Sequence, residues 1–228
     1  MENMEYFIAK TNEINPGIYS PEWDKAQTGY IDKNLSGDGL FPSPKTFFKL
    51  LEGPEGLSVL MHTEEKNLRS EIKEENGEVC EDSCMEFFFK PTPWDARYLN
   101  FEVNPEGVMH IGIGTGRHDR TLITEDRKTF DIVSVPNDGD WTVKYYIPFS
   151  FIDKWYPNIE ELSLDNSTNI AKGNFYKCGE ETDHPHFACW SEVITDIADF
   201  HVPDFFGRLI FQEAKKSFGP GTILLNNI

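Results

Sequence analysis

The sequence predicts an all-β protein, a jelly-roll-like β-sandwich of mainly antiparallel strands with one or two short helices. Short apolar stretches recur at strand-like spacing, turn sequences rich in Gly, Pro, Asn and Asp separate them, and long amphipathic helical windows are scarce. A sandwich of 228 residues usually stays one domain. We therefore expect a single domain over 1–228, with 1–45 as its loop-rich N-terminal part.

The elements are expected in the following order. Residues 15–44 carry turn sequences, with one helical turn beginning at Pro21. A charged surface loop is expected over 64–78, and a short helix over 148–155 with Ser150 as its cap. The expected strands are 46–51, 57–63, 84–90, 98–103, 108–114, 130–135, 141–147 and the later segments NFYKC, HFACW and GRLIF.

Two turn sequences predict hairpins. The NPEG turn at 104–107 joins the strands on either side of it, and the NDGD turn at 137–140 does the same for 130–135 and 141–147. The sequence therefore predicts that several strands pair with their neighbours along the chain.

The charge of the chain limits its partners. Asp and Glu total 39 against 21 Lys and Arg, a formal net charge of -18. Such a surface repels phosphate backbones and anionic lipid, so we expect no nucleic-acid and no membrane partner. No apolar run reaches the roughly 20 residues of a membrane span, and MENMEYFIAK is not a secretory signal. Together with four cysteines lacking a disulfide pattern, this predicts a cytoplasmic protein, or a secreted one if a signal has been removed.

Polar residues on two expected strands predict a site. Side chains alternate across a strand, so Tyr98, Asn100 and Glu102 share one face while the apolar residues between them face the core. The same alternation puts Glu86 on the polar side of strand 84–90. If the strands are neighbours, the two carboxylates lie on one face, where they could bind hydroxyls or calcium, or act as an acid–base pair. An ordinary solvated face is the alternative.

The stretch from Asn174 to Phe211 is dense in aromatic rings and also carries Lys177 and Phe200. Sugars present C–H faces that lie on aromatic rings, and hydroxyls that need donors and acceptors. The stretch is therefore typical of a sugar site, although each ring taken alone is better explained as core.

Other chemistry has weaker support. Cys178, His184, His186 and Cys189 offer sulfur and imidazole for zinc, but their spacing fits no standard finger, and packing cysteines and a loop histidine are the simpler reading. There is no GxSxG or HExxH motif. GIGTG at 112–116 is interpreted as a glycine-rich turn, and His118 to Arg120 as a solvated polar tip.

Five segments together resemble the family 9 carbohydrate-binding modules and their bacterial relatives. They are EDSCMEFFF at 81–89, YLNFEVN at 98–104, GNFYKCG at 173–179, PHFACW at 185–190 and PDFFGRLIF at 203–211. The resemblance implies a jelly-roll sandwich that binds sugars at chain ends without turnover, in proteins often joined to xylan-degrading enzymes. It also implies structural calcium, for which the sequence has no EF-hand loop.

The resemblance carries over to particular positions. Glu86 matches the family's acidic ligand contact, and Glu102 matches a polar contact that is an arginine in the best-known pattern. Of the two tryptophans that clamp the sugar in that pattern, one falls near Cys80 and the other near Phe200, so only half of the clamp can stack. Trp190 matches a tryptophan that is expected in the core.

These observations predict non-catalytic binding of a mono- or oligosaccharide, of plant-type glycan such as xylan, with no certain cofactor. The expected ligand-binding residues are Glu86, Tyr98, Asn100, Glu102, Lys177 and Phe200. The alternatives are a glycoside hydrolase that uses Glu86 and Glu102, and a structural or partner-binding domain.

Overall fold

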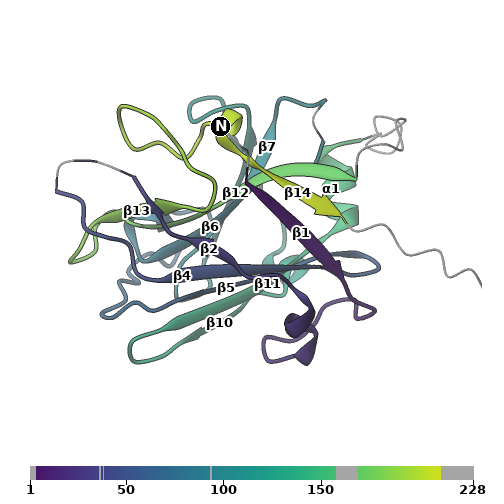
Figure 1. Ribbon diagram of the computed structural model, residues 1–228, viewed down its shortest axis with the longest axis horizontal. Coiled ribbons are helices and arrows are strands. Elements are labelled where there is room, and N and C mark those ends of the chain that lie inside the picture. Colours follow the sequence, from purple (N-terminus) through teal and green to yellow (C-terminus); the bar gives the residue numbers. More distant parts are fainter. Residues whose placement is uncertain (1–3, 36, 38, 93, 158–168, 212–228) are drawn as a thin grey trace, which may run out of the picture.

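Strands dominate the computed structural model, which describes residues 4–35, 37, 39–92, 94–157 and 169–211 (Figure 1). The strands are β1 (Glu5–Lys10), β2 (Gly29–Ile31), β3 (Lys33–Asn34), β4 (Thr46–Glu52), β5 (Gly56–Thr63), β6 (Cys84–Lys90), β7 (Tyr98–Val103), β8 (Met109–Gly114), β9 (Thr121–Leu122), β10 (Val133–Pro136), β11 (Trp141–Pro148), β12 (Ile170–Gly179), β13 (His186–Cys189) and β14 (Gly207–Phe211). The helical elements are η1 (Pro21–Lys25), η2 (Val79–Glu81), η3 (Arg127–Phe130), α1 (Phe149–Trp155) and η4 (Pro203–Phe205).

The strands form two layers joined by β1. One layer runs β10-β11-β5-β4 and the other β14-β12-β6-β7-β8-β9, while β1 pairs in parallel with both β4 and β14. The remaining strand pairs are antiparallel. In Figure 1, β1 is the purple strand that runs obliquely from beside β14 towards β4. The prediction of a mainly antiparallel β-sandwich is confirmed.

Aromatic rings from both layers interleave in the core between them. The ring of Phe175 lies between Phe48 and Phe87, with centroid distances of 3.5 and 4.3 Å. Phe101 faces Tyr145 of the opposite layer at 6.1 Å. Large rings bury the most apolar area per residue, so this stack is a main source of the sandwich's stability.

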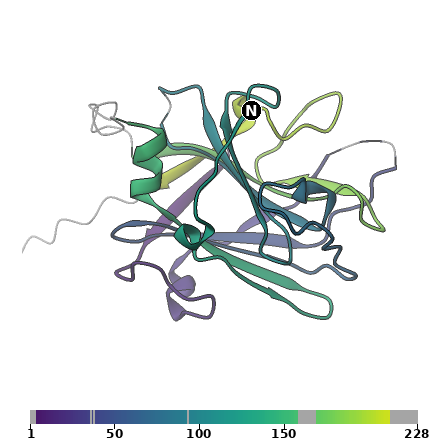
Figure 2. The same cartoon turned by 180° about the vertical axis from the view of Figure 1, so that it is seen from behind.

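Both predicted hairpins are confirmed. β7 pairs with β8, and β10 pairs with β11, in antiparallel register. The helical turn at Pro21 and the helix after Pro148 also form, and α1 lies at one end of the molecule (Figure 2). Residues 64–78 form neither helix nor strand, as expected.

The assignment of Ser150 as a helix cap was wrong. Pro148 occupies the cap position in an extended conformation, and no side chain caps the helix. The first helical N–H group, that of Phe149, instead donates to the carbonyl oxygen of Glu55 at 2.8 Å. A backbone carbonyl of the turn between β4 and β5 therefore satisfies a helix N–H group that a cap side chain would otherwise pair with.

Several strands were not predicted, among them β1 to β3 in the part expected to be loop-rich. β1 contributes Tyr6 and Ile8, both with no exposed surface.

Among the described residues, no helix is long and apolar enough to cross a membrane.

The side chain of Tyr6 links β1 to β4 outside the short stretch in which the two strands pair. β1 and β4 pair only at Ala9 and Lys10. The Tyr6 hydroxyl accepts a hydrogen bond from the Leu50 N–H at 2.9 Å and donates to the Gln27 carbonyl oxygen. The side chain thus satisfies a buried backbone donor that the ladder does not reach.

Tyr6→Phe should therefore lower the free energy of unfolding by about 1–3 kcal/mol, because it leaves the Leu50 N–H buried and unpaired. Urea unfolding followed by circular dichroism measures the change. Tyr30→Phe is the matched control, since Tyr30 is 61% exposed, and it should be neutral. Equal stability of the two variants would contradict this role of Tyr6.

Candidate functional site

A polar cleft opens on the outer face of the layer that contains β6, β7 and β8. Glu86 lies directly opposite Glu102 across β6 and β7, and Asn100 lies opposite both Phe88 and Gly112. The prediction that the two carboxylates share a face is therefore confirmed. The cleft measures about 520 Å³. It is lined by Glu78, Cys80, Glu86, Asn100, Glu102, His110, Arg117, Arg120, Leu122, Cys178, Glu180, Phe187, Ile197, Ala198, Phe200 and His201.

A second apolar cluster borders the cleft, so this face of the sheet is not an ordinary solvated one. Its buried members include Phe88, Tyr98, Tyr176, Phe200 and Phe206. Phe200 and Phe206 come from the loop region between β13 and β14, which covers part of the outer face. With this cover on one face and the core on the other, every residue of β7 is buried.

Three polar side chains form a connected chain along the floor. An Arg120 N–H donates to the Asn100 side-chain oxygen, and the Asn100 amide donates to the Glu102 carboxylate at 2.6 Å. The Arg120 guanidinium lies over the Tyr98 ring at 4.7 Å. Its Nε and Nη1 atoms are buried and have no hydrogen-bond partner among the described residues. Buried donors without a partner are uncommon in folded proteins, so these two set Arg120 apart from the other floor residues.

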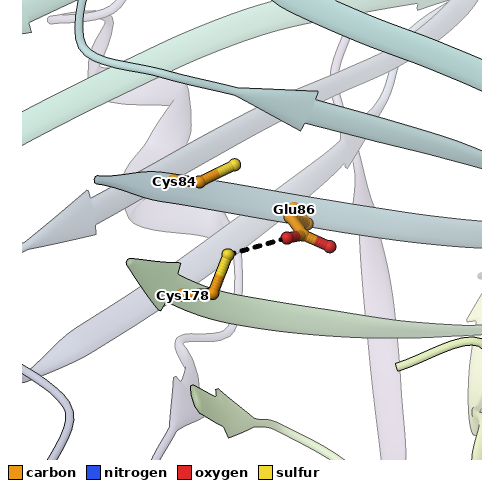
Figure 3. Close-up of side chains that lie close together, drawn as sticks. All are labelled: Cys84, Glu86 and Cys178. Atoms are coloured by element: carbon orange, nitrogen blue, oxygen red, sulfur yellow. Dashed lines mark hydrogen bonds between the residues drawn. The ribbon is translucent and has the colours of Figure 1, made fainter. Parts of the chain in front are cut away.

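Glu86 is nearly enclosed, with 2% of its surface exposed. Burial raises its pKa well above the usual range, and the nearby charge of Glu102 raises it further. The thiol of Cys178 donates to the Glu86 carboxylate at 2.9 Å (Figure 3). The two carboxylates are thus chemically unequal although they come from equivalent positions of neighbouring strands.

The six predicted ligand residues do not all reach the cleft. Glu86, Asn100, Glu102 and Phe200 line it. Tyr98 lies beneath it with no exposed surface, and its hydroxyl pairs with His201 Nδ1 at 2.8 Å.

Lys177 points to the other face of the sheet. It lies opposite Met85 in the register of β12 and β6, on the side that faces the core. There its ammonium pairs with Glu65 at 3.0 Å and with His186 Nε2 at 3.0 Å. The strand alternation that places Cys178 in the cleft turns Lys177 away from it.

Sequence reasoning missed Arg117, Arg120 and His201, which loops bring to the cleft, and Phe187 of β13. The interpretation of 118–120 as a solvated tip was wrong for Arg120, which is half-buried against the sheet. Arg117 pairs with Asp199 at 2.9 Å.

The sequence feature that could have indicated the place of Arg120 is the glycine at position 112. A Cβ at Gly112 would lie 2.8 Å from the Asn100 side-chain oxygen and 3.2 Å from Arg120 Nε. Glycine at this position leaves the space in which the guanidinium rests.

The zinc set considered from the sequence does not assemble. His186 contacts Lys177 and the carbonyl oxygen of His184, while Cys189 donates to the carbonyl oxygen of Lys33 at 3.5 Å. Cys178 instead lies beside Glu86. Cys178 and Cys189 are both buried, as expected for packing residues.

Asp82 anchors the loop over residues 64–78, which reaches the cleft at Glu78. Its carboxylate has no exposed surface and accepts from the N–H groups of Glu71 and Ile72, each at 2.9 Å. Asn104 donates to it at 2.9 Å, and Arg69 forms a salt bridge with it. Burial alone would raise the pKa of Asp82, but these hydrogen bonds outweigh it and lower the pKa.

The fold and the site define a carbohydrate-binding β-sandwich, in which carboxylates, an amide and a guanidinium line a cleft bordered by aromatic rings. Residues 34–211 match the model of carbohydrate-binding family 9, and the chain belongs to that family. This confirms the resemblance found in the five sequence segments. No curated protein matches the chain.

Solved structures share the fold. A protein proposed to bind carbohydrate, from Bacteroides uniformis ATCC 8492, aligns with a TM-score of 0.75 and 24% identity over 92% of this chain and 100% of that one. A family 9 carbohydrate-binding module from Caldicellulosiruptor kristjanssonii in complex with glucose aligns with a TM-score of 0.63 and 12% identity, over 95% of this chain and 100% of that one. The complex of such a module with cellotriose aligns with a TM-score of 0.63 and 13% identity, over 96% of this chain and 100% of that one.

Asp82→Asn should destabilise the protein by about 2–4 kcal/mol at neutral pH, because an amide cannot accept from all of these donors. The folded-state pKa of Asp82 is depressed, so its contribution is present above the unfolded-state pKa of about 3.9 and is lost as pH falls through the lower folded value. The stability gap between wild type and variant should therefore narrow below about pH 4.

Thermal and urea unfolding from pH 7 to pH 2 measures this gap. Asp138→Asn removes an exposed charge and should leave the profile unchanged. A gap for Asp82→Asn that is constant with pH would argue against the charged form as the anchor.

Proposed function

We propose that the chain binds the ring of a neutral sugar in this cleft, without chemical turnover. The observation that carries the proposal is the hydrogen-bonded chain from Arg120 through Asn100 to Glu102, which places a guanidinium, an amide and a carboxylate along the cleft beside Glu86. Alternating donors and acceptors fixed by one another are suited to the hydroxyls of a sugar, each of which both donates and accepts.

The rings at the border supply the apolar part of the contact. Phe200 is stacked on Tyr176 at 4.1 Å, and Phe187 meets its edge at 5.7 Å. Phe187 is only partly buried, so it has surface left for the C–H face of a sugar. Such stacking contributes about 1 kcal/mol beyond burial, so affinity for a monosaccharide should be micromolar or weaker.

The charges of the cleft favour a neutral ligand over an acidic one. Glu78, Glu102 and Glu180 line it against Arg117 and Arg120, while the raised pKa of the buried Glu86 favours its neutral form. Because Arg117 is already paired with Asp199, a uronic acid would meet an excess of negative charge. The family and the glucose and cellotriose complexes of similar structures support glucose-type residues, and plant-type glycans such as cellulose or xylan oligosaccharides are the candidate sources.

The placement of the carboxylates favours binding over hydrolysis. Glycosidases flank the scissile bond with two carboxyl groups. Glu86 and Glu102 instead stand side by side on neighbouring strands of one sheet face. Both therefore approach a ligand from the same side, as hydrogen-bonding groups do.

Glu102→Gln should reduce affinity for cellobiose roughly 10- to 100-fold, the cost of one charge-assisted hydrogen bond. The variant keeps the shape of the side chain, and its melting temperature should stay near that of the wild type. Isothermal titration calorimetry measures the affinity. Glu106→Gln, at the adjacent turn with a 53% exposed side chain, is the control for lost charge. Wild-type affinity in Glu102→Gln would refute this site.

Gly112→Ala should also weaken sugar binding, by roughly tenfold, because its methyl group displaces the Arg120 guanidinium and so removes a charge-assisted donor. Gly116→Ala is the matched control, since the nearest atom to its added Cβ is 3.9 Å away. Calorimetry with cellobiose compares the two. If both variants bind like wild type, Arg120 has no part in sugar binding.

A further inference from the structure

Two cysteines and a glutamate converge beneath the sugar cleft. Cys84 of β6 lies directly opposite Cys178 of β12, and Glu86 follows two positions along β6 on the same face. The two sulfurs and one carboxylate oxygen all lie within 4.8 Å of one another. Figure 3 shows the three side chains gathered on one side of the paired strands. In the described part of the chain, it is the one group of three His, Cys, Asp or Glu side chains close enough together to hold a metal ion.

The cluster is closed to bulk water except through the cleft. Cys84 and Cys178 have 0% and 1% of their surface exposed, and Glu86 has 2%. Glu86 and Cys178 also line the cleft, whereas Cys84 lies behind them. A small ion can thus enter from the cleft and reach all three groups.

The positive charges near the cluster are those of Lys177, which acts on both cysteines through space, and of Arg117. Glu102 stands beside Glu86, and Arg117 acts on Glu86 through its charge without a hydrogen bond in the described structure. The hydrogen bond that the described structure gives to the Glu86 carboxylate comes from the Cys178 thiol. Burying three acidic groups together is costly unless they stay protonated or a cation joins them.

We propose that Cys84, Glu86 and Cys178 form a binding site for a thiophilic divalent metal ion of the zinc class. Two sulfurs exclude calcium and magnesium as the preferred ions, because those take oxygen ligands. In a tetrahedral zinc site, neighbouring donor atoms are about 3.4–3.8 Å apart, which follows from bonds of about 2.0–2.3 Å. The donors here need to move by less than about an ångström to reach that geometry.

Binding would release the thiol protons and replace the Cys178–Glu86 hydrogen bond with bonds to the metal. Because Glu86 and Cys178 line the cleft, a fourth ligand such as water or a sugar hydroxyl would come from there. One oxygen of Glu86 would hold the metal. The proposal does not depend on sugar binding, since its three ligands and its test involve no sugar.

The test uses cobalt(II), a spectroscopic substitute for zinc. Reduced, tag-free protein is titrated with Co²⁺ under anaerobic conditions. We expect one Co²⁺ per chain, with the strong visible absorption of a tetrahedral site and a near-ultraviolet thiolate-to-cobalt band, both abolished by added Zn²⁺. The absorption should be lost in Cys178→Ser and Cys84→Ser.

Cys189→Ser is the matched control, because Cys189 is an equally buried thiol that contacts the carbonyl oxygen of Lys33 instead. It should keep the full cobalt spectrum. Glu86→Gln carries the test if a serine variant fails to fold, and it should weaken Co²⁺ binding while circular dichroism stays unchanged. Folded wild-type protein without the thiolate band, or a spectrum retained in folded Cys178→Ser or Glu86→Gln, would overturn the site.

Discussion

The register between β6 and β7 is the constraint on which the cleft depends. It places Glu86 opposite Glu102 on the outer face and Phe87 opposite Phe101 on the inner face. A slip of β7 by one residue would turn Glu102 into the core and Phe101 towards the cleft, so Glu86 would lose its partner on the outer face. The stack of Phe87 on Phe175 and the contact of Phe101 with the opposite layer hold this register. The apolar face of the sheet therefore determines the chemistry of its polar face.

Covering the outer face changes what the polar residues can do. In many antiparallel sandwiches that face is solvated, and a carboxylate there gains little from one more hydrogen bond. Here the loop region that carries Phe200 and Phe206 shields it, and the floor residues are connected to one another. A donor or acceptor held in such surroundings interacts more strongly than in water, and its geometry is set before a ligand arrives.

The alternation of the strands was enough to predict the floor of the cleft, and little beyond it. Asn100 and Glu102 follow from one strand with an apolar face, and the NPEG turn fixes its partner β8. Lys177 was misplaced because its neighbourhood was read as an aromatic-rich stretch, although alternation with Tyr176 and Cys178 put it on the opposite face. The place of Arg120 depends on how the loop between β8 and β9 returns over the sheet, and that of Phe187 on the pairing of β13 with β12 and β3, which local patterns do not specify. β1 escaped notice because no turn sequence marks it and its burial alternates imperfectly.

The position of β1 has a consequence for how the protein is made. Glu5 lies opposite Arg208, so the strand that joins the layers borders β14, the last strand in the described part of the chain. During translation β1 leaves the ribosome well before its neighbour β14. Tyr6 and Ile8 thus stay without their final surroundings until β14 has emerged, and closure of the sandwich is a late, slow event with an aggregation-prone edge exposed beforehand.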